Sequence, residues 1–210
     1  MKHIILLGDS IFDNKVYVGS GKSTIENLRE QMPEGWKAAL LAVDGNVTNH
    51  VPGQLRNLPD DATHLFVSVG GNDALGEMSI LQMPARSGVD VFNALSDVSE
   101  RFEHNYSKML DAVLALNKPT AVCTIYYPRF DEPVVQKLAV AALATFNDVI
   151  IRQAFLRKLP LIDLRYVCDE YGDYANAIEP SVSGGAKIAK MILRLIGEHS
   201  FEARPASAYL

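Results

Sequence analysis

Residues 3–10 read His-Ile-Ile-Leu-Leu-Gly-Asp-Ser, a short apolar run that ends at a glycine and two polar side chains. An aliphatic run of this length, bounded by a turn residue, is typical of a buried β-strand. Gly8 can adopt backbone conformations that other residues avoid, so it permits a sharp turn after the strand. We therefore expect a strand over residues 3–7, with Ser10 held above its carboxyl end.

Further strand-like and helix-like segments alternate along the rest of the chain. Four more apolar runs have strand length: 37–43, 63–69, 119–125 and 159–163. Helical spacing of apolar residues occurs at about 20–32, 51–57, 89–116, 132–158 and 183–198. This alternation predicts an α/β fold in which a parallel sheet of five strands lies between two helix layers. Ligands of such sheets bind at the carboxyl ends of the strands.

Length and composition fit one globular domain. The chain has 210 residues, of which 48% are hydrophobic, enough for one sizeable core. We expect the domain to span residues 1–202. The last segment, 203–210, contains Pro205 and small residues and is expected to be a loosely held tail.

Charge and hydropathy narrow the classes of partner. The formal net charge is −5, which argues against a nucleic-acid groove or an anionic membrane surface as the main partner. The first apolar run is too short for a signal peptide, and we find no run close to the ~18 apolar residues of a membrane-spanning helix. We therefore expect a cytoplasmic protein without membrane insertion. Cys123 and Cys168 are expected to be free thiols.

Small polar residues follow the first three predicted strands. Ser10 follows the first strand, Gly45 the second and Asn72 the third. Parallel strands bring these positions to one edge of the sheet. The N–H groups of Ser10 and Gly45 and the Asn72 amide would then form an oxyanion hole around a nucleophilic serine, which is what acyl transfer requires.

In these blocks the sequence resembles the SGNH, or GDSL-type, hydrolases. The blocks are Gly8-Asp9-Ser10 with the following Ile11 to Asn14, then Gly45, then Gly71-Asn72-Asp73, and a last block at 176–181. The resemblance implies a flavodoxin-like three-layer sandwich and the cleavage of acyl or acetyl esters. It also implies that Ser10 is the nucleophile and first oxyanion donor, with Gly45 and Asn72 as further donors. The implied substrate is a small-molecule ester, and no cofactor is expected.

The last block departs from the family pattern of Asp-x-x-His-Pro. Asn176 and Glu179 stand where the aspartate and the histidine base are expected. A neutral Asn with an ionised Glu carries the same charge as an Asp with a neutral His, so we expect Glu179 to act as the general base. Asn176 is expected to donate its amide N–H to the Glu179 carboxylate. A free Glu, with a pKa of about 4.3, is a weak base unless desolvation raises that pKa.

Other interpretations of the sequence remain open at this stage. His50 is the one histidine downstream of a strand end near the site and is an alternative base. Loss of the usual base is also compatible with a catalytically silent protein that binds an acyl or glycan ligand. Residues 19–24, Gly-Ser-Gly-Lys-Ser-Thr, resemble the end of a nucleotide-binding P-loop but lack its first glycine. The remaining pocket candidates are Asp9, Asp73, Tyr127 and Arg129.

Overall fold

Six parallel strands form one sheet in the computed structural model, which describes residues 1–201 and 206–210. Their order across the sheet is β2-β1-β3-β4-β5-β6, and the first five follow the flavodoxin-like order. The prediction of a parallel α/β sheet is confirmed. The strands are β1 (His3–Gly8), β2 (Lys37–Leu40), β3 (His64–Ser68), β4 (Thr120–Cys123), β5 (Leu161–Ile162) and β6 (Ala208–Tyr209).

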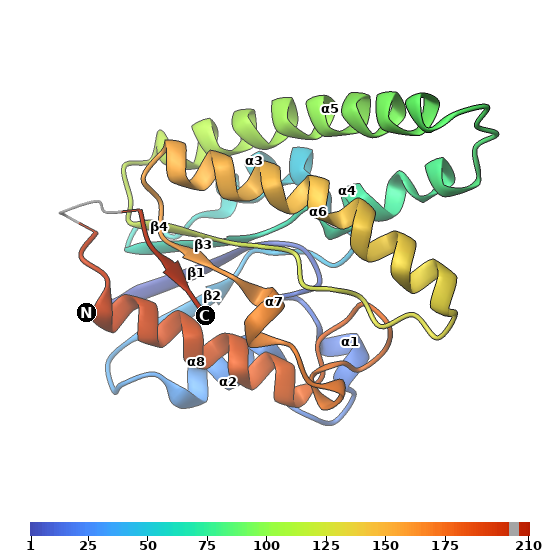
Figure 1. Cartoon of the computed structure of the whole chain (residues 1–210). Coiled ribbons are helices and arrows are strands. Elements are labelled where there is room, and N and C mark those ends of the chain that lie inside the picture. Colours follow the sequence, from blue (N-terminus) through green and yellow to red (C-terminus); the bar gives the residue numbers. More distant parts are fainter. Residues whose placement is uncertain (202–205) are drawn as a thin grey trace.

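Helices cover both faces of the sheet and complete the predicted three layers (Figure 1). The α-helices are α1 (Lys15–Val18), α2 (Thr24–Gln31), α3 (Val51–Gln54), α4 (Gly71–Gly76), α5 (Gly88–Leu114), α6 (Pro133–Leu156), α7 (Leu164–Val167) and α8 (Val182–Glu198). Short 3₁₀ helices lie at η1 (Thr48–His50), η2 (Leu55–Asn57), η3 (Met78–Gln82) and η4 (Tyr171–Asp173).

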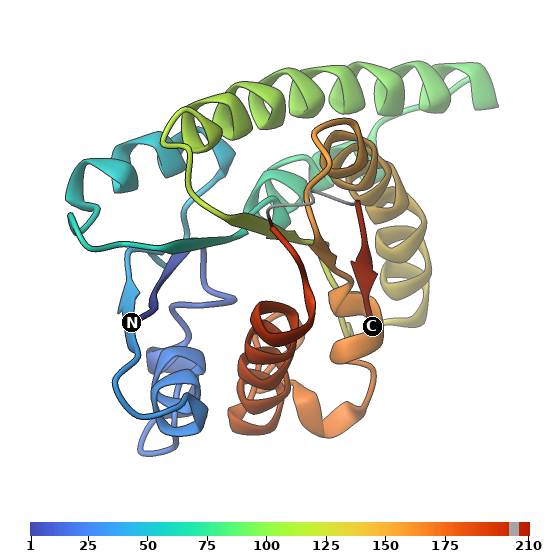
Figure 2. The ribbon, with the colours of Figure 1, turned by 90° about the vertical axis from the view of Figure 1, so that its left-hand side faces the viewer.

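Alternation of side chains along the strands divides the core in two. In β1, Ile4 and Leu6 pack towards α2 and α8, whereas Ile5 and Leu7 pack towards α5 and α6. Figure 2 shows α2 and α8 on one side of the sheet and α5 and α6 on the other. Every residue from Ile4 to Leu7 is fully buried, and β1 pairs with both β2 and β3. The prediction of a buried strand is therefore confirmed.

The sixth strand corrects the expectation of a loose tail over 203–210. Residues 203–205 lie outside the described part of the chain, but Ala208 and Tyr209 pair with β5 in parallel register. The backbone N–H groups of Leu161 and Asp163 donate to the carbonyls of Ser207 and Tyr209 at 2.8 and 2.9 Å. A strand of two residues is too short to show any hydrophobic period, so its sequence carried no signal.

Helix α6 is more apolar than the sequence analysis expected. Its 24 residues contain an 18-residue window with a mean hydropathy of 1.6, so length and composition alone would allow it to cross a membrane. In the fold it packs on α5 and the sheet through Leu143, Phe146 and Ile150, which are buried in the core. Only 28% of that window is buried, however, and the residues from Pro133 to Ala142 are all exposed or half-buried.

The turn after β1 requires glycine at position 8. Gly8 has a φ of +126°, and a Cβ atom there would lie 1.8 Å from the Ser68 carbonyl oxygen. The side chain of Gln54 then fixes the Gly8 peptide, since its Oε1 accepts from the Gly8 N–H and its Nε2 donates to the Gly8 carbonyl at 2.9 and 2.7 Å. Ser10 is thus displayed from a rigid strand end.

Candidate active site

Ser10 and Glu179 meet at the carboxyl end of the sheet. The Ser10 hydroxyl donates to Oε1 of Glu179 at 3.1 Å, although 169 positions separate the two residues. Ser10 is 6% exposed and Glu179 is 5% exposed. Within the described ranges, the second carboxylate oxygen of Glu179 is buried without a hydrogen-bond partner. The pair therefore has the contact that a nucleophile and its base require.

A tight turn presents Glu179 to Ser10. Asn176 Oδ1 accepts from the backbone N–H groups of Ile178 and Glu179, both at 2.9 Å. Asn176 therefore orients the main chain before the carboxylate, in the manner of an Asx turn. The expected donation from the Asn176 amide to the Glu179 carboxylate is not what the structure shows, because the side-chain oxygen is the atom that faces Glu179.

Two further side chains hold the residues that flank Glu179. The Tyr126 hydroxyl donates to the Ile178 carbonyl at 2.6 Å. Asn14 is fully buried, and its amide donates to the Pro180 carbonyl at 2.9 Å while its Oδ1 accepts from the Thr24 N–H at 2.8 Å. Asn14 belongs to the serine block and thus links that block directly to the last one.

Burial changes the acid–base properties of Glu179. Desolvation raises its pKa to about 7, against the opposing effect of the Ser10 hydrogen bond and with a smaller contribution from the charge of Asp44. A carboxylate with that pKa is a much stronger base than a free Glu. The weakness that the sequence suggested for a glutamate base is therefore removed by its surroundings.

Asp9 is a second buried carboxyl beside the pair. It is 2% exposed, and its Oδ1 accepts from the Ile11 N–H at 3.2 Å. Desolvation, together with the nearby Glu179 charge, raises the pKa of Asp9 to about 8. Asp9 is thus mainly protonated at neutral pH, which keeps the polar end of the site from holding two negative charges.

The three expected oxyanion donors differ in how they are placed. Within the described part of the chain, the Ser10 N–H donates to no other group and is free for a ligand. The Asn72 amide donates one hydrogen to the Asn46 carbonyl at 2.9 Å, which orients it and leaves the second hydrogen available. Gly45 lies in the exposed turn after β2 with a φ of +76°. Ser10 and Asn72 line a common pocket, and Gly45 does not.

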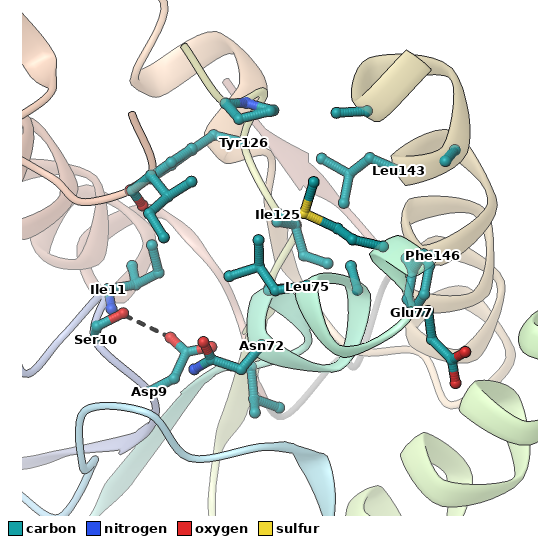
Figure 3. A pocket seen from close by; sticks show the side chains of 18 of the residues that line it. Asp9, Ser10, Ile11, Asn72, Leu75, Glu77, Ile125, Tyr126, Leu143 and Phe146 are labelled. Atoms are coloured by element: carbon teal, nitrogen blue, oxygen red, sulfur yellow. Dashed lines mark hydrogen bonds between the residues drawn. The ribbon is translucent and has the colours of Figure 1, made fainter. Parts of the chain in front are cut away.

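That pocket extends from Ser10 into the α5–α6 layer. Asp9, Ser10 and Asn72 lie at one end, and Leu143 and Phe146 of α6 lie at the other (Figure 3). The wall between them is apolar and is supplied by α4, η3, α5, α6 and the segment after β4. Its members include Leu75, Met78, Ile80, Leu81, Leu95, Ile125 and Ala142. Sequence reasoning missed this wall, because a helical period shows which residues are apolar but not where two helices separate.

Two predicted pocket residues after β4 face elsewhere. Tyr126, Pro128 and Phe130 line the pocket, whereas Tyr127 and Arg129, which were expected to, do not. Successive residues of an extended segment point to opposite sides, so from Tyr126 onwards the expected residues had the wrong parity. Arg129 instead packs over the Tyr174 ring, 5.2 Å from its centroid, and its backbone N–H donates to the Ala177 carbonyl at 2.7 Å.

Asp73 and His50 also have roles away from Ser10. Asp73 Oδ2 accepts from the backbone and the hydroxyl of Thr48 at 2.9 and 3.0 Å, so it ties the loop after β2 to α4. His50 is exposed, and its Nδ1 accepts from the Val47 N–H at 3.2 Å. No histidine lines the pocket within residues 1–201 and 206–210. The geometry therefore favours Glu179 over His50 as the partner of Ser10.

Residues 19–24 form a helix cap. The Glu26 carboxylate accepts from the Ser23 backbone and hydroxyl at 2.8 and 2.9 Å, which is a capping box at the start of α2. Lys22, the residue that would contact phosphates in a P-loop, is paired with Glu30. The side chains of Lys22 and Ser23 are thus engaged by the protein itself.

Comparisons with known proteins bear on the family and the fold of this chain. The model of the GDSL-like lipase/acylhydrolase family matches residues 6–185. No curated protein matches the sequence. Among solved structures, the lipase Lip_vut3 from a goat rumen metagenome has a TM-score of 0.72 at 20% identity, covering 96% of this chain and 100% of that one.

Two further solved structures show the same fold. An extracellular lipase from Streptomyces rimosus has a TM-score of 0.66 at 16% identity, covering 95% of this chain and 100% of that one. The esterase EstA from Pseudoalteromonas sp., inhibited by monoethylphosphonate, has a TM-score of 0.61 at 15% identity, covering 94% and 100%. With the family model spanning the serine, glycine and asparagine blocks, the chain belongs to the GDSL-like lipase/acylhydrolase family.

Proposed function

We propose that this chain is a serine esterase that cleaves carboxylic esters through an acyl-enzyme on Ser10, with Glu179 as the general base. The observation that carries the proposal is the 3.1 Å hydrogen bond from the Ser10 hydroxyl to a buried carboxylate. A glutamate with a pKa of about 7 is half ionised at neutral pH and can both accept and return a proton.

In the first step, Ser10 Oγ attacks the carbonyl carbon of the ester while its proton moves to Glu179. The Ser10 N–H and the Asn72 amide are suited to stabilise the resulting oxyanion, and Gly45 would join them only if its turn moved towards the pocket. Collapse of the tetrahedral intermediate breaks the bond to the alcohol, which leaves with the proton from Glu179. The products of this step are the free alcohol and the Ser10 ester.

In the second step, a water molecule attacks the acyl-enzyme and transfers a proton to Glu179. The carboxylic acid leaves when Ser10 takes that proton back, so the site returns to its starting state. Asn176 and Asn14 act as positioning residues, because they hold the main chain on either side of Glu179. The acyl group would occupy the apolar pocket, since the pocket wall begins directly at Ser10.

Labelling with a fluorophosphonate tests the nucleophile. We expect one label per chain on Ser10, and a burst of p-nitrophenol from p-nitrophenyl acetate. Both are expected to disappear in Ser10→Ala with its circular dichroism unchanged. Absence of labelling between pH 6 and 9 would overturn the proposal in favour of a silent protein that binds an acyl or glycan ligand. A phosphonate is a suitable probe because the similar esterase EstA is inhibited by one.

A further inference from the structure

Helix α6 carries a row of apolar side chains that leads out of the pocket. Phe146 is buried at the inner end of the pocket, and Ala142 lines it one turn earlier. Leu138 and Val134 continue this row at spacings of four residues, and they are 41% and 61% exposed. Residues four apart lie on one side of a helix. The row therefore runs from the protein core through the pocket to the surface.

Helix α5 carries a second row of the same kind. Val98 is buried and Leu95 lines the pocket, while Val91, one turn before Leu95, is 37% exposed. Phe92 beside it is 74% exposed. In Figure 1 the N-terminal ends of α5 and α6 diverge. We call the four exposed side chains Val91, Phe92, Val134 and Leu138 the apolar rim.

The surface of this part of α6 has few charges. Between Pro133 and Asn147 the sole charged residue is Lys137. The chain as a whole carries a formal net charge of −5, so an anionic surface would repel it. An aromatic and three aliphatic side chains exposed around a pocket mark an interaction site for an uncharged apolar partner.

We propose that the apolar rim docks the protein on the surface of an uncharged lipid aggregate, from which an ester with an aliphatic chain enters the pocket. This inference rests on the proposed esterase function, because the pocket that the rim surrounds begins at Ser10. Docking of this kind needs no membrane-spanning helix. It places the side chains of the rim among the acyl chains at the interface.

A second copy of the chain is the main competing occupant of the rim. A protein surface that covered Leu138 and Val91 would lie one helical turn from Ala142 and Leu95, and so would close the path to Ser10. A lipid aggregate on the same side chains is itself the source of the substrate. The continuity of both rows with the pocket therefore favours lipid over self-association.

Flotation with vesicles of palmitoyl-oleoyl phosphatidylcholine tests the proposal. The Ser10→Ala protein is used, so that lipid is not consumed and binding can be scored even if the esterase proposal fails. We expect it to float with the vesicles. The double variant Phe92→Asp/Val134→Glu in the same background should bind about tenfold less, because two apolar contacts with lipid are lost. Adding anionic phosphatidylglycerol should not increase binding.

Leu156→Glu is the matched control, since Leu156 is on the same helix and is 73% exposed but lies at its other end. It should bind as strongly as the parent. With Ser10 intact, the double variant should hydrolyse soluble p-nitrophenyl acetate at the parent rate. Failure of the parent to float, or equal flotation of the double variant, overturns the proposal. So does a parent dimer that the double variant converts to a monomer, which would assign the rim to a second copy.

Discussion

The two helix layers of this protein differ in how closely they pack. In the layer of α2 and α8, glycines bring backbones together: a Cβ atom at Gly185 would lie 3.0 Å from the Thr24 hydroxyl, and one at Gly184 would lie 2.2 Å from the Asp173 carbonyl. We call this the tight layer. In the layer of α5 and α6, which we call the open layer, a pocket lies among the helices.

The two layers therefore serve different parts of the site: the tight layer positions Glu179, and the open layer forms the pocket. Glu179 lies three residues before the start of α8, and Asn14 joins the main chain beside it to the start of α2. The tight layer can therefore hold the base in a fixed position relative to Ser10. The open layer supplies the apolar wall and can vary without moving the reacting groups. Substitutions in the two layers should consequently have different kinetic effects.

The largest effect is expected for Glu179→Gln, which removes the base and leaves a side chain of equal size. General-base catalysis contributes roughly 10²–10⁴-fold, so kcat/KM for p-nitrophenyl acetate should fall by about that factor. In the parent, the rate should rise with pH through about 7, where Glu179 ionises. Stopped-flow or steady-state rates from pH 5 to 9 measure both.

The double variant Asn176→Asp/Glu179→His is the matched control for this position. It restores the pair that the family pattern has, and we expect it to regain most of the activity that Glu179→Gln loses. A Glu179→Gln protein with the full parental rate would mean that Ser10 is activated by another group, and the tight layer would then have no role in the chemistry.

The next effect concerns stability and comes from the buried carboxyls at the polar end of the pocket. Burial raises the pKa of Glu179 from 4.5 to about 7 and that of Asp9 from 3.8 to about 8. Both groups hold protons in the fold that the unfolded chain has released. Their contribution to the free energy of unfolding should therefore be highest below about pH 4 and fall as the pH rises to about 8.

The Glu179 contribution to that fall is on the order of 3 kcal/mol, from its pKa shift. Urea unfolding at intervals from pH 4 to 8.5 measures it. Asp9→Asn and Glu179→Gln should each flatten the curve, whereas Glu103→Gln, on the exposed side of the open layer, should not flatten it between these limits. A curve that rises over this range would show that neither group is protonated in the fold.

The sequence was sufficient to predict the helices of the tight layer and the place of Ser10 after β1, and the reasons are local. The run from Ile4 to Leu7 and the obligatory Gly8 are properties of neighbouring residues, as is the strong helical period of 183–198. The replacement of the family histidine by Glu179 was visible for the same reason. These features depend on patterns among neighbouring residues, which can be recognised without knowing the contacts of the rest of the chain.

The open layer and the fine geometry of the site depend on contacts between distant segments. The raised pKa of Glu179 comes from burial by other elements, and the link from Asn14 to Pro180 joins residues 166 positions apart. Tyr127 and Arg129 were wrongly chosen because the sequence does not show which side of the segment after β4 faces the pocket. Ala208 and Tyr209 became a strand only because β5 offered them a free edge.

Two buried asparagines provide a matched test of the two layers. Asn14 bonds the Pro180 carbonyl beside Glu179 and the Thr24 N–H at the start of α2. Asn147 of α6 bonds the N–H and carbonyl of Ile125, both at 2.8 Å. Alanine at either position leaves two buried polar groups unpaired, so each should lower the free energy of unfolding by about 2–4 kcal/mol. If the two variants lose the same free energy of unfolding, their kinetic effects can be compared directly.

The kinetic effects of these two variants should differ. Asn14→Ala should lower kcat by about tenfold, a cost of ~1.4 kcal/mol in the transition state, because the base is no longer held in place. Asn147→Ala should instead raise KM for longer esters, because Ile125 lines the pocket. Urea unfolding and steady-state kinetics on acetate and octanoate esters give these values. A fall in kcat for both variants would remove the distinction between the layers.

The smallest effect is expected within the pocket, from Ala142→Phe. The added ring occupies space between Ser10 and Phe146, so the ratio of kcat/KM for p-nitrophenyl octanoate to that for the acetate should fall about tenfold, or ~1.4 kcal/mol. Ala144→Phe, two residues away on the exposed side of α6, should leave the ratio at its parental value. If Ala142→Phe lowers both rates equally, the acyl chain does not enter the open layer. The alcohol part of the ester would then be the group that the pocket binds.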